Sequence, residues 1–268
     1  MNQMIKHLQR SEPRRALILF TSDPGKEALR KKIGKTPGEN RAIYQAFLRH
    51  LLHVALSARE TVAFDFVIAS DATDEPNIHR AFAAFPDAPG FTFLPHSGTC
   101  FAAKFPHALK TTLENSYDQA VIIGNDCLDL TTETLAAAFQ SLDERDISLG
   151  PARDGGFYLL GLKQFDEQLF GNIQWCSDAV LAQVNANIRR LKKSVALLPQ
   201  LKDIDNSRDL HRWLCEAQNG LNALLANTLL AHIALNILTT IYLPPFLTKL
   251  HFRKRLWQLP PPGNSFTV

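Results

Sequence analysis

Residues 119–130 read QAVIIGNDCLDL, an apolar run with polar residues directly after it. The unbroken run AVII is typical of a strand buried on both faces, because a strand with one exposed face would alternate apolar and polar residues. The run stops at a glycine, and Asn125 and Asp126 follow. We predict a buried strand over residues 119–124 that presents Asp126 at its carboxyl end.

Similar short apolar runs recur along the chain and alternate with stretches of helical periodicity. Further strands are expected at residues 16–20, 64–69, 91–94, 147–150, 157–162 and 195–198. Helices are expected at residues 40–59, 101–114, 131–142, 177–191 and 207–218. This alternation predicts an α/β fold with a mainly parallel sheet covered by helices on both faces. Ligands bind beyond the carboxyl ends of the strands in such sheets, so polar residues at those ends are candidate site residues.

The chain of 268 residues is 46% hydrophobic and 21% charged, which suits one large α/β domain or a domain with a small appendage. A formal net charge of +3, with scattered Lys and Arg residues, argues against a nucleic-acid partner. Residues 1–15 lack the apolar region of a secretory signal, so we expect a cytoplasmic protein. None of the four cysteines forms a C-x-x-C pair, and we expect free, mostly buried thiols.

Residues 221–243 are rich in Leu, Ile and Ala but also carry Asn, Thr and His, which are costly in a membrane interior. We expect a domain over residues 14–218, and a C-terminal helical extension and tail over 219–268. The extension would pack on the domain or on a second subunit. The alternatives are an anchor at the inner membrane face, where Trp257 and neighbouring basic residues suit the interface, and poor order.

Asp126 is the first candidate site residue. A carboxylate directly after a buried strand points into the cleft at the sheet edge, and Mg²⁺ prefers carboxylate and phosphate oxygens. The alternative is that Asp126 caps a turn and that Asp129 starts the next helix.

A second candidate block is Asp154-Gly155-Gly156, which lies between two predicted strands. Glycines here would let the backbone approach a ligand closely, and Asp154 could accept a hydrogen bond from a sugar hydroxyl or help to activate an acceptor. The alternative is a hairpin-like turn with no further role.

A third block, residues 201–210, reads LKDIDNSRDL. Asp205 precedes a helix that Asn206 or Ser207 could cap. Asp203 and Asp205 share one side of an extended segment, so at most one of them needs to face the cleft.

Basic residues follow the first predicted strand and its turn at residues 21–25. Lys26, Arg30 and Lys31 could bind phosphate, although a run of this kind is equally a solvated loop. The stretch contains no P-loop motif.

Four blocks, at residues 124–130, 149–162, 169–177 and 201–210, together resemble a family of bacterial GT-A-like glycosyltransferases known as radical-SAM/selenodomain-associated transferase 1. The resemblance covers roughly residues 14–215. It implies a Rossmann-like, three-layer nucleotide-diphospho-sugar transferase fold and a divalent metal, Mg²⁺ or Mn²⁺. In related transferases the aspartate matching Asp126 is a metal ligand, and the one matching Asp205 often helps to hold the metal.

The resemblance implies a metal-dependent transferase with a nucleotide-sugar or nucleotide donor and a small or lipid-linked acceptor. Asp126 and Asp205 would hold the metal, and Asp154 would position or deprotonate the acceptor. The remaining expected contacts to the donor are Lys26, Arg30, Lys31, Gly155 and Gly156. The family's Pro-Gly-x-x-Lys-Thr-Arg-Leu loop and Gly-Asp-Leu-Gly-Glu-Arg block are altered here, at residues 24–33 and 98–104. The alternative is therefore a degenerate module that binds a nucleotide or a partner protein without turnover.

Overall fold

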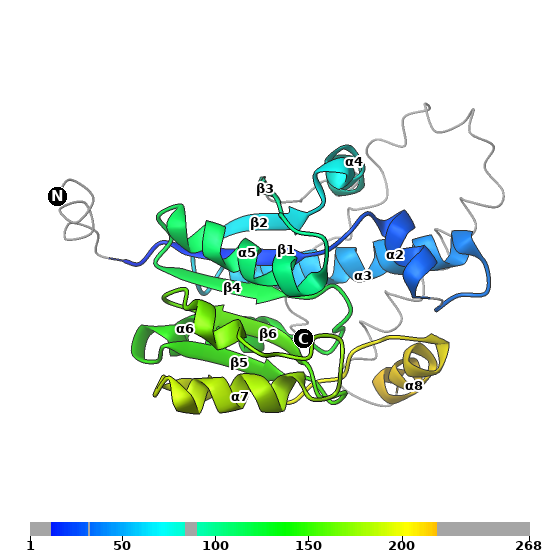
Figure 1. Ribbon diagram of the computed structural model, residues 1–268. Helices are drawn as coiled ribbons and strands as arrows, with labels where there is room; N and C mark the ends of the chain where they lie inside the picture. The colour runs from blue at the N-terminus through cyan, green and yellow to red at the C-terminus, as the bar shows by residue number, and fades with distance from the viewer. Residues whose placement is uncertain (1–11, 32, 84–89, 219–268) are drawn as a thin grey trace, which may run out of the picture.

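Strand β4 (Gln119–Ile123) is buried at every residue, as its unbroken apolar run predicts. It pairs with β1 (Arg15–Phe20) in parallel and with β6 (Phe157–Leu162) in antiparallel orientation. The computed structural model describes residues 12–31, 33–83 and 90–218, and this part of the chain forms a sheet with helices on both faces (Figure 1).

The sheet has seven strands in the order β3-β2-β1-β4-β6-β5-β7. The remaining strands are β2 (Asp65–Ser70), β3 (Phe91–Pro95), β5 (Ile147–Pro151) and β7 (Val195–Leu197). Strand β6 is antiparallel to both of its neighbours, and the other neighbouring pairs are parallel. The prediction of a mainly parallel sheet is therefore confirmed.

Alternate residues of β1 enter two separate cores, one on each face of the sheet. Leu17 and Leu19 pack with α3 (Pro37–Ala58), α4 (Glu75–Ala83) and α6 (Thr132–Glu144). Ala16 and Ile18 pack with α5 (Phe101–Glu114) and α7 (Val180–Arg190), the two helices at the front of Figure 1. Three layers result, as expected.

The segment after β1 differs from the predicted loop, because it forms helix α2 (Pro24–Arg30). Asp23 caps it by accepting hydrogen bonds from the backbone N–H groups of Gly25 and Lys26, at 2.7 and 3.1 Å. Pro24 is the first helical residue, where a missing N–H group costs nothing. The Pro-Gly pair that indicated a turn therefore begins a helix.

The remaining helical elements had mixed outcomes. Helix α4 and the 3₁₀ turns Ala72–Asp74 and Glu167–Phe170 were not predicted. Helix α4 buries only Ile78 and Phe82, which is too few apolar residues for a clear periodicity. Helix α8 (Ser207–Gln218) lies where a helix was expected, and Asn206 caps it, accepting from the N–H groups of Arg208 and Asp209.

Helix α8 closes a small third core beneath the carboxyl ends of the strands. Its Leu210 and Trp213 pack with residues of α2 and α3 and with Leu128 and Ile204. The Trp213 indole N–H also donates to the Asp129 carboxylate, at 2.6 Å. Asp129 therefore does not start the next helix as considered above; Thr131 caps α6 instead.

All four cysteines are thiols rather than disulfide partners, as expected, but only Cys127 is buried. The expectation of mostly buried thiols is wrong, because Cys100 and Cys176 lie in exposed loops and Cys215 lies on the outer side of α8. The expected C-terminal extension, residues 219–268, lies outside the described residues. No helix within the described ranges is long and apolar enough to cross a membrane.

The contact between Trp213 and Asp129 should stabilise the docking of α8. Trp213→Phe keeps most of the buried ring but removes the N–H donor, and we expect the free energy of unfolding to fall by about 1–3 kcal/mol. Urea denaturation of this variant, of Asp129→Ala and of the double variant measures the coupling between the two side chains. Fully additive losses in the double variant would contradict the contribution of the hydrogen bond.

Candidate functional site

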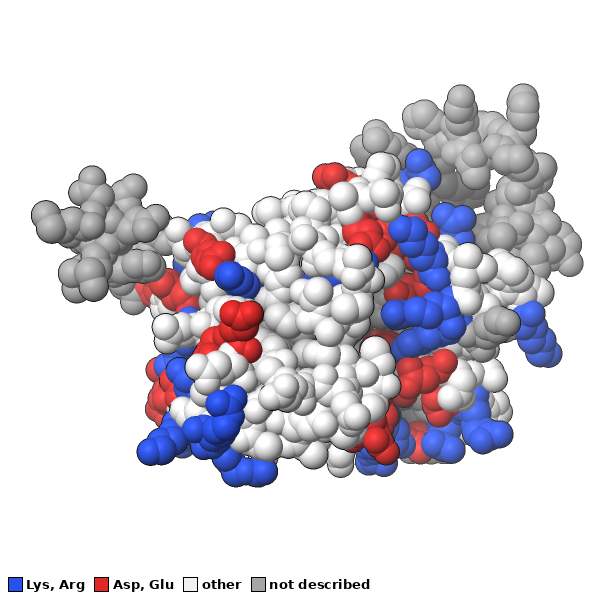
Figure 2. Space-filling view, in the orientation of Figure 1, with Lys and Arg blue, Asp and Glu red and all other residues white. Residues whose placement is uncertain are grey.

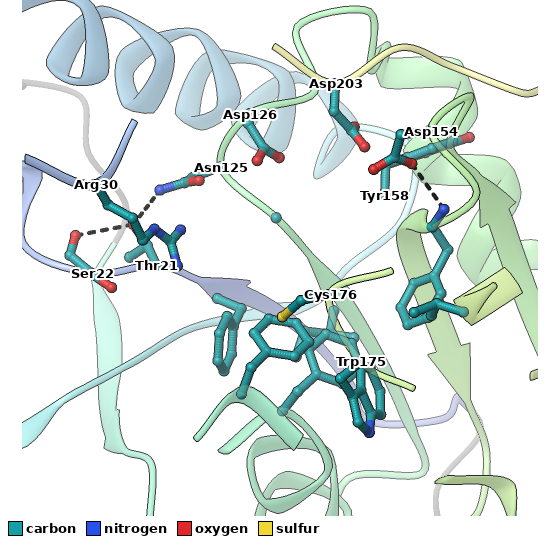
Figure 3. Close-up of a pocket in the computed structure, with 18 of the residues that line it drawn as sticks. Thr21, Ser22, Arg30, Asn125, Asp126, Asp154, Tyr158, Trp175, Cys176 and Asp203 are labelled. Carbon is teal, nitrogen blue, oxygen red and sulfur yellow. Dashed lines mark hydrogen bonds between the residues drawn. The ribbon is translucent and has the colours of Figure 1, made fainter. Parts of the chain in front are cut away.

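A cavity of about 420 Å³ opens at the carboxyl ends of β1 and β4 (Figure 3). The chain leaves β1 toward one face of the sheet and reaches β4 from the other face, through α5. Such a switch point leaves a crevice between neighbouring strands, and this volume suits a small-molecule ligand.

The loops after β1 and β4 are joined by a buried hydrogen bond. The Asn125 side-chain amide donates to the Thr21 hydroxyl, at 3.0 Å. This contact fixes the start of the loop that carries Asp126, and Asp126 lines the cavity. The predicted position of Asp126, at the carboxyl end of β4, is therefore confirmed.

Asp126 and Asp205 meet at the ammonium group of Lys31. The Lys31 Nζ atom contacts Asp126 Oδ2 and lies 2.6 Å from Asp205 Oδ1. The side chains of Lys31 and Asp126 are 17% and 22% exposed, and that of Asp205 is 48% exposed. Three segments that are distant in the chain are thus joined by one cation.

The environment of Lys31 keeps it charged. Burial acts to lower the pKa of the ammonium, but the charges and hydrogen bonds of Asp126 and Asp205 outweigh burial and raise the pKa above its ordinary value. Figure 2 shows side chains of both signs gathered near α2 and α8, whereas the face over α5 is mostly uncharged.

Asp203 is a site residue that the sequence reasoning did not select. It lines the cavity, and burial, together with the charges of Asp126 and Asp154, raises its pKa to about 8. One of its oxygens, Oδ1, is buried without a hydrogen-bond partner. Ile204 is buried, so Asp203 and Asp205 both turn away from the core and toward the site. The sequence indicates that Asp203 and Asp205 share one side of the segment, and it was expected that only one of them needs to face the cleft. In the structure both residues face this way.

The Asp154-Gly155-Gly156 turn borders the cavity through its first and last residues. Asp154 Oδ1 accepts a hydrogen bond from the Gly156 N–H group, at 2.9 Å. Gly155 has a φ of +92°, and a side chain there would collide with the Asp178 carbonyl oxygen. Gly155 therefore seats the loop that ends at Asp178, and it does not itself line the cavity.

The three predicted phosphate contacts lie in different places. Arg30 lines the cavity and pairs with Glu27, at 2.8 Å, while its side chain stays 62% exposed. Lys31 is held by the two carboxylates described above. Lys26 lies outside the cavity lining, where it pairs with the buried Asp74.

The opposite side of the cavity is aromatic. We call it the aromatic floor, formed by Phe20, Phe101, Phe105, Phe157 and Trp175. Neighbouring ring centroids are 5.3 to 6.4 Å apart. In Figure 3, Trp175 of the floor lies below the group formed by Asp126, Asp203 and Asp154. The spacing of Phe101 and Phe105, one helical turn apart, was the only trace of the floor in the sequence.

Residues 54–177 match a family described as an uncharacterized protein conserved in bacteria (DUF2064). No curated protein matches the chain. A solved structure from Desulfovibrio desulfuricans G20, provisionally named a nucleotide-diphospho-sugar transferase, is 24% identical, with a TM-score of 0.70, and the match covers 84% of this chain and 99% of that one.

Two further solved structures are more distant. A CMP:2-keto-3-deoxy-manno-octonic acid synthetase with CTP is 10% identical over 80% of this chain and 99% of its own, with a TM-score of 0.49. A mannosyltransferase from Pyrobaculum calidifontis with GDP-Man and Mn²⁺ is 17% identical over 81% and 67%, with a TM-score of 0.47. The likeness to the Desulfovibrio protein shows that the chain has the fold of nucleotide-diphospho-sugar transferases.

Proposed function

We propose that the domain over residues 14–218 is a metal-dependent transferase with a nucleotide-sugar or nucleotide donor and a small or lipid-linked acceptor. The observation that carries the proposal is the meeting of Asp126 and Asp205 at one cation beside a cavity at the switch point of the sheet. Two carboxylates that already share a cation beside a cleft could hold a divalent metal, which would offset the charge of a donor diphosphate. The motifs that resemble radical-SAM/selenodomain-associated transferase 1 support the same function.

The donor atoms fit a divalent cation. Mg²⁺ and Mn²⁺ are commonly held by one or two carboxylates together with substrate phosphates. Asp126 and Asp205 would supply the carboxylates, and the Lys31 ammonium between them marks a place where positive charge is already accommodated. Within the described part of the chain, no group of three or more His, Cys, Asp or Glu side chains could hold a metal alone. The donor phosphates would therefore complete the site, and the bound metal would neutralise their charge.

The other residues around the cavity bind and orient the substrates. Arg30 reaches into the cavity with an exposed guanidinium group, which suits bidentate binding of a phosphate. Lys31 would move from the carboxylates to the phosphates, and Lys26 would approach from the rim. The Gly156 backbone lets the donor approach closely.

Asp154 would hold the acceptor hydroxyl. In the transfer, the acceptor oxygen bonds to the reacting atom of the donor as the bond from that atom to the leaving phosphate oxygen breaks. The hydroxyl proton passes to Asp154, and the leaving group retains the electron pair. Positioning and charge neutralisation supply most of the rate enhancement in such a reaction.

The alternative, a module that binds a nucleotide without turnover, is favoured by a specific observation. Lys31 already neutralises the two carboxylates that would hold the metal. The two functions differ in metal-linked donor binding and in turnover.

Asp126→Asn should abolish metal-linked donor binding. We expect a nucleoside diphosphate or its sugar to raise the thermal midpoint of the wild-type chain more with Mn²⁺ than without it, by about 2–3 kcal/mol of stabilisation at a hundredfold excess over the dissociation constant. The variant should lose the Mn²⁺-dependent part. Asp143→Asn, which changes a carboxylate paired with Arg15 away from the cavity, is the control.

Asp154→Asn should bind the same donor and turn it over at least about a hundredfold more slowly, because a general base commonly contributes that much. The measurement is the release of nucleotide, which reports hydrolysis or transfer.

Unchanged metal-linked binding in Asp126→Asn would refute the cation site. Donor binding without any turnover by the wild type would favour the non-catalytic module.

Lys31→Met should reveal the competition between the ammonium and a metal. Without metal, we expect the free energy of unfolding to fall by about 1–3 kcal/mol, because two partly screened carboxylates lose their shared cation. Mn²⁺ alone should raise the thermal midpoint of the variant more than that of the wild type. Lys110→Met, which changes an exposed lysine beside Glu114, should leave both values unchanged. Equal Mn²⁺ shifts in wild type and Lys31→Met would contradict a shared cation site.

Asp203 should make the metal-free protein less stable as the pH rises. Its pKa is higher in the folded than in the unfolded state, so the folded chain keeps the proton between about pH 4 and pH 8 while the unfolded chain loses it. The free energy of unfolding then falls by up to about 1.4 kcal/mol per pH unit across that range. Asp203→Asn should remove this loss, so urea denaturation should show a gain at pH 7.5 that disappears near pH 4. A gain of equal size at both pH values would contradict the raised pKa.

A further inference from the structure

The aromatic floor offers surface to a ligand. Phe105 is almost fully buried, whereas Phe101 keeps 36% of its surface exposed and Trp175 is only half-buried. Complete burial of a phenylalanine contributes roughly 1.5–3 kcal/mol, so ring surface left open at a cavity is surface that a ligand can cover favourably. Phe101 and Trp175 therefore do more than fill the hydrophobic core, because part of their ring surface is available to a ligand.

The floor is poor in hydrogen-bonding groups. Ile122 and Val180 add apolar surface to the cavity, whereas the polar lining residues Ser22, Ser177 and Asp178 come from the loops after β1 and before α7. The amide of Asn125 is engaged with Thr21, and Lys104 of the same helix as Phe101 is engaged with Asp71, at 2.6 Å. A nucleobase on the rings would find few hydrogen-bond partners among them, and each ring nitrogen or exocyclic group left unpaired would cost about 1–3 kcal/mol. The floor suits an apolar group instead.

The rings of the floor suit a planar group. Phe101 and Phe105 are nearly parallel, with an interplanar angle of 20°, whereas Phe157 and Trp175 meet at 71°. The floor thus presents both ring faces and ring edges, and a planar aromatic system can use both, by stacking and by edge-to-face contact. An aliphatic chain would gain only the burial of its surface.

Two carboxylates stand at the rim above the floor. Asp154 and Asp178 both line the cavity and are exposed. Neither forms an ion pair with any residue in the described ranges. Asp154 uses Oδ1 for the Gly156 N–H group, and its carboxylate can also accept a hydrogen bond from a hydroxyl group.

We propose that the acceptor is an alcohol that carries an apolar, planar ring, with the ring on the aromatic floor and the hydroxyl group at Asp154. The proposal rests on the proposed transferase function, and it names the acceptor class of the same site. The ionic side of the cavity, around Asp126 and Arg30, remains for the donor.

A matched pair of alcohols tests the ring preference. Calorimetry compares the binding of 2-naphthalenemethanol with that of its saturated analogue, decahydro-2-naphthalenemethanol. We expect the wild-type chain to bind the aromatic alcohol about tenfold more tightly, which corresponds to about 1.4 kcal/mol of ring contact. Equal affinity for the two alcohols, or no binding of either, would overturn the proposal.

Phe101→Leu keeps apolar volume at the floor but removes a ring. We expect this variant to lose most of the preference for the aromatic alcohol and to retain binding of the saturated one. Leu29→Ala, which changes an exposed apolar side chain of α2 outside the cavity lining, is the control and should keep the full preference. A preference that survives in Phe101→Leu would count against the floor as the binding place.

The same variant separates this proposal from the transferase function. The Mn²⁺-linked thermal shift with a nucleoside diphosphate should be unchanged in Phe101→Leu, since the donor binds on the ionic side. If that shift falls instead, and the nucleotide displaces the aromatic alcohol from the wild type, the floor holds a nucleobase. The acceptor proposal is then wrong, whereas the cation site tested with Asp126→Asn is unaffected.

Discussion

The ammonium of Lys31 lies between Asp126 and Asp205 and joins three segments at the carboxyl ends of the strands. The three residues follow α2, follow β4 and precede α8, and no strand pairing links α2 or α8 to the sheet. A carboxylate pair that close would repel, and a shared cation converts that repulsion into attraction. The third core, in which Trp213 packs with residues of α2 and α3, lies beneath the same edge. The charge contact and the apolar contact thus fix the same three segments.

The two faces of the sheet give the cavity two chemically different sides. Helix α2 and the loops after β4, after β5 and before α8 bring the charged residues, while α5, which crosses to the other face before β4, brings Phe101 and Phe105. The switch point between β1 and β4 is where both sets can reach one cavity. The proposed transfer needs a charged donor and an acceptor side by side, and the two sides of the cavity would give each of them a separate surface.

The sequence predicts the parts of this arrangement that are local. Unbroken apolar runs identify the strands, because burial on both faces leaves no room for alternation. Helix α2 was missed because Pro24 and the following glycine signal a turn as well as they start a helix. Asp126 could be placed because its strand is unmistakable, whereas Asp203 could not, since its exposure to the cavity depends on Ile204 entering the third core. The aromatic floor is assembled from four separate segments, and no pattern along the chain joins Phe101 to Trp175.

The ionic side carries less charge than its residue types suggest. Asp126, Asp203 and Asp205 could carry three negative charges, but burial raises the pKa of Asp203 and Lys31 compensates one charge of the other two. An excess of about one negative charge remains, which would repel the proposed donor diphosphate if it arrived without a metal. In the proposed reaction, a divalent cation held by Asp126 and Asp205 would reverse that sign and would leave the ammonium of Lys31 available to the phosphates. If the proposal holds, the three carboxylates that would oppose an uncomplexed diphosphate would favour one that brings its metal, and this selectivity would come from the balance of charges around Lys31.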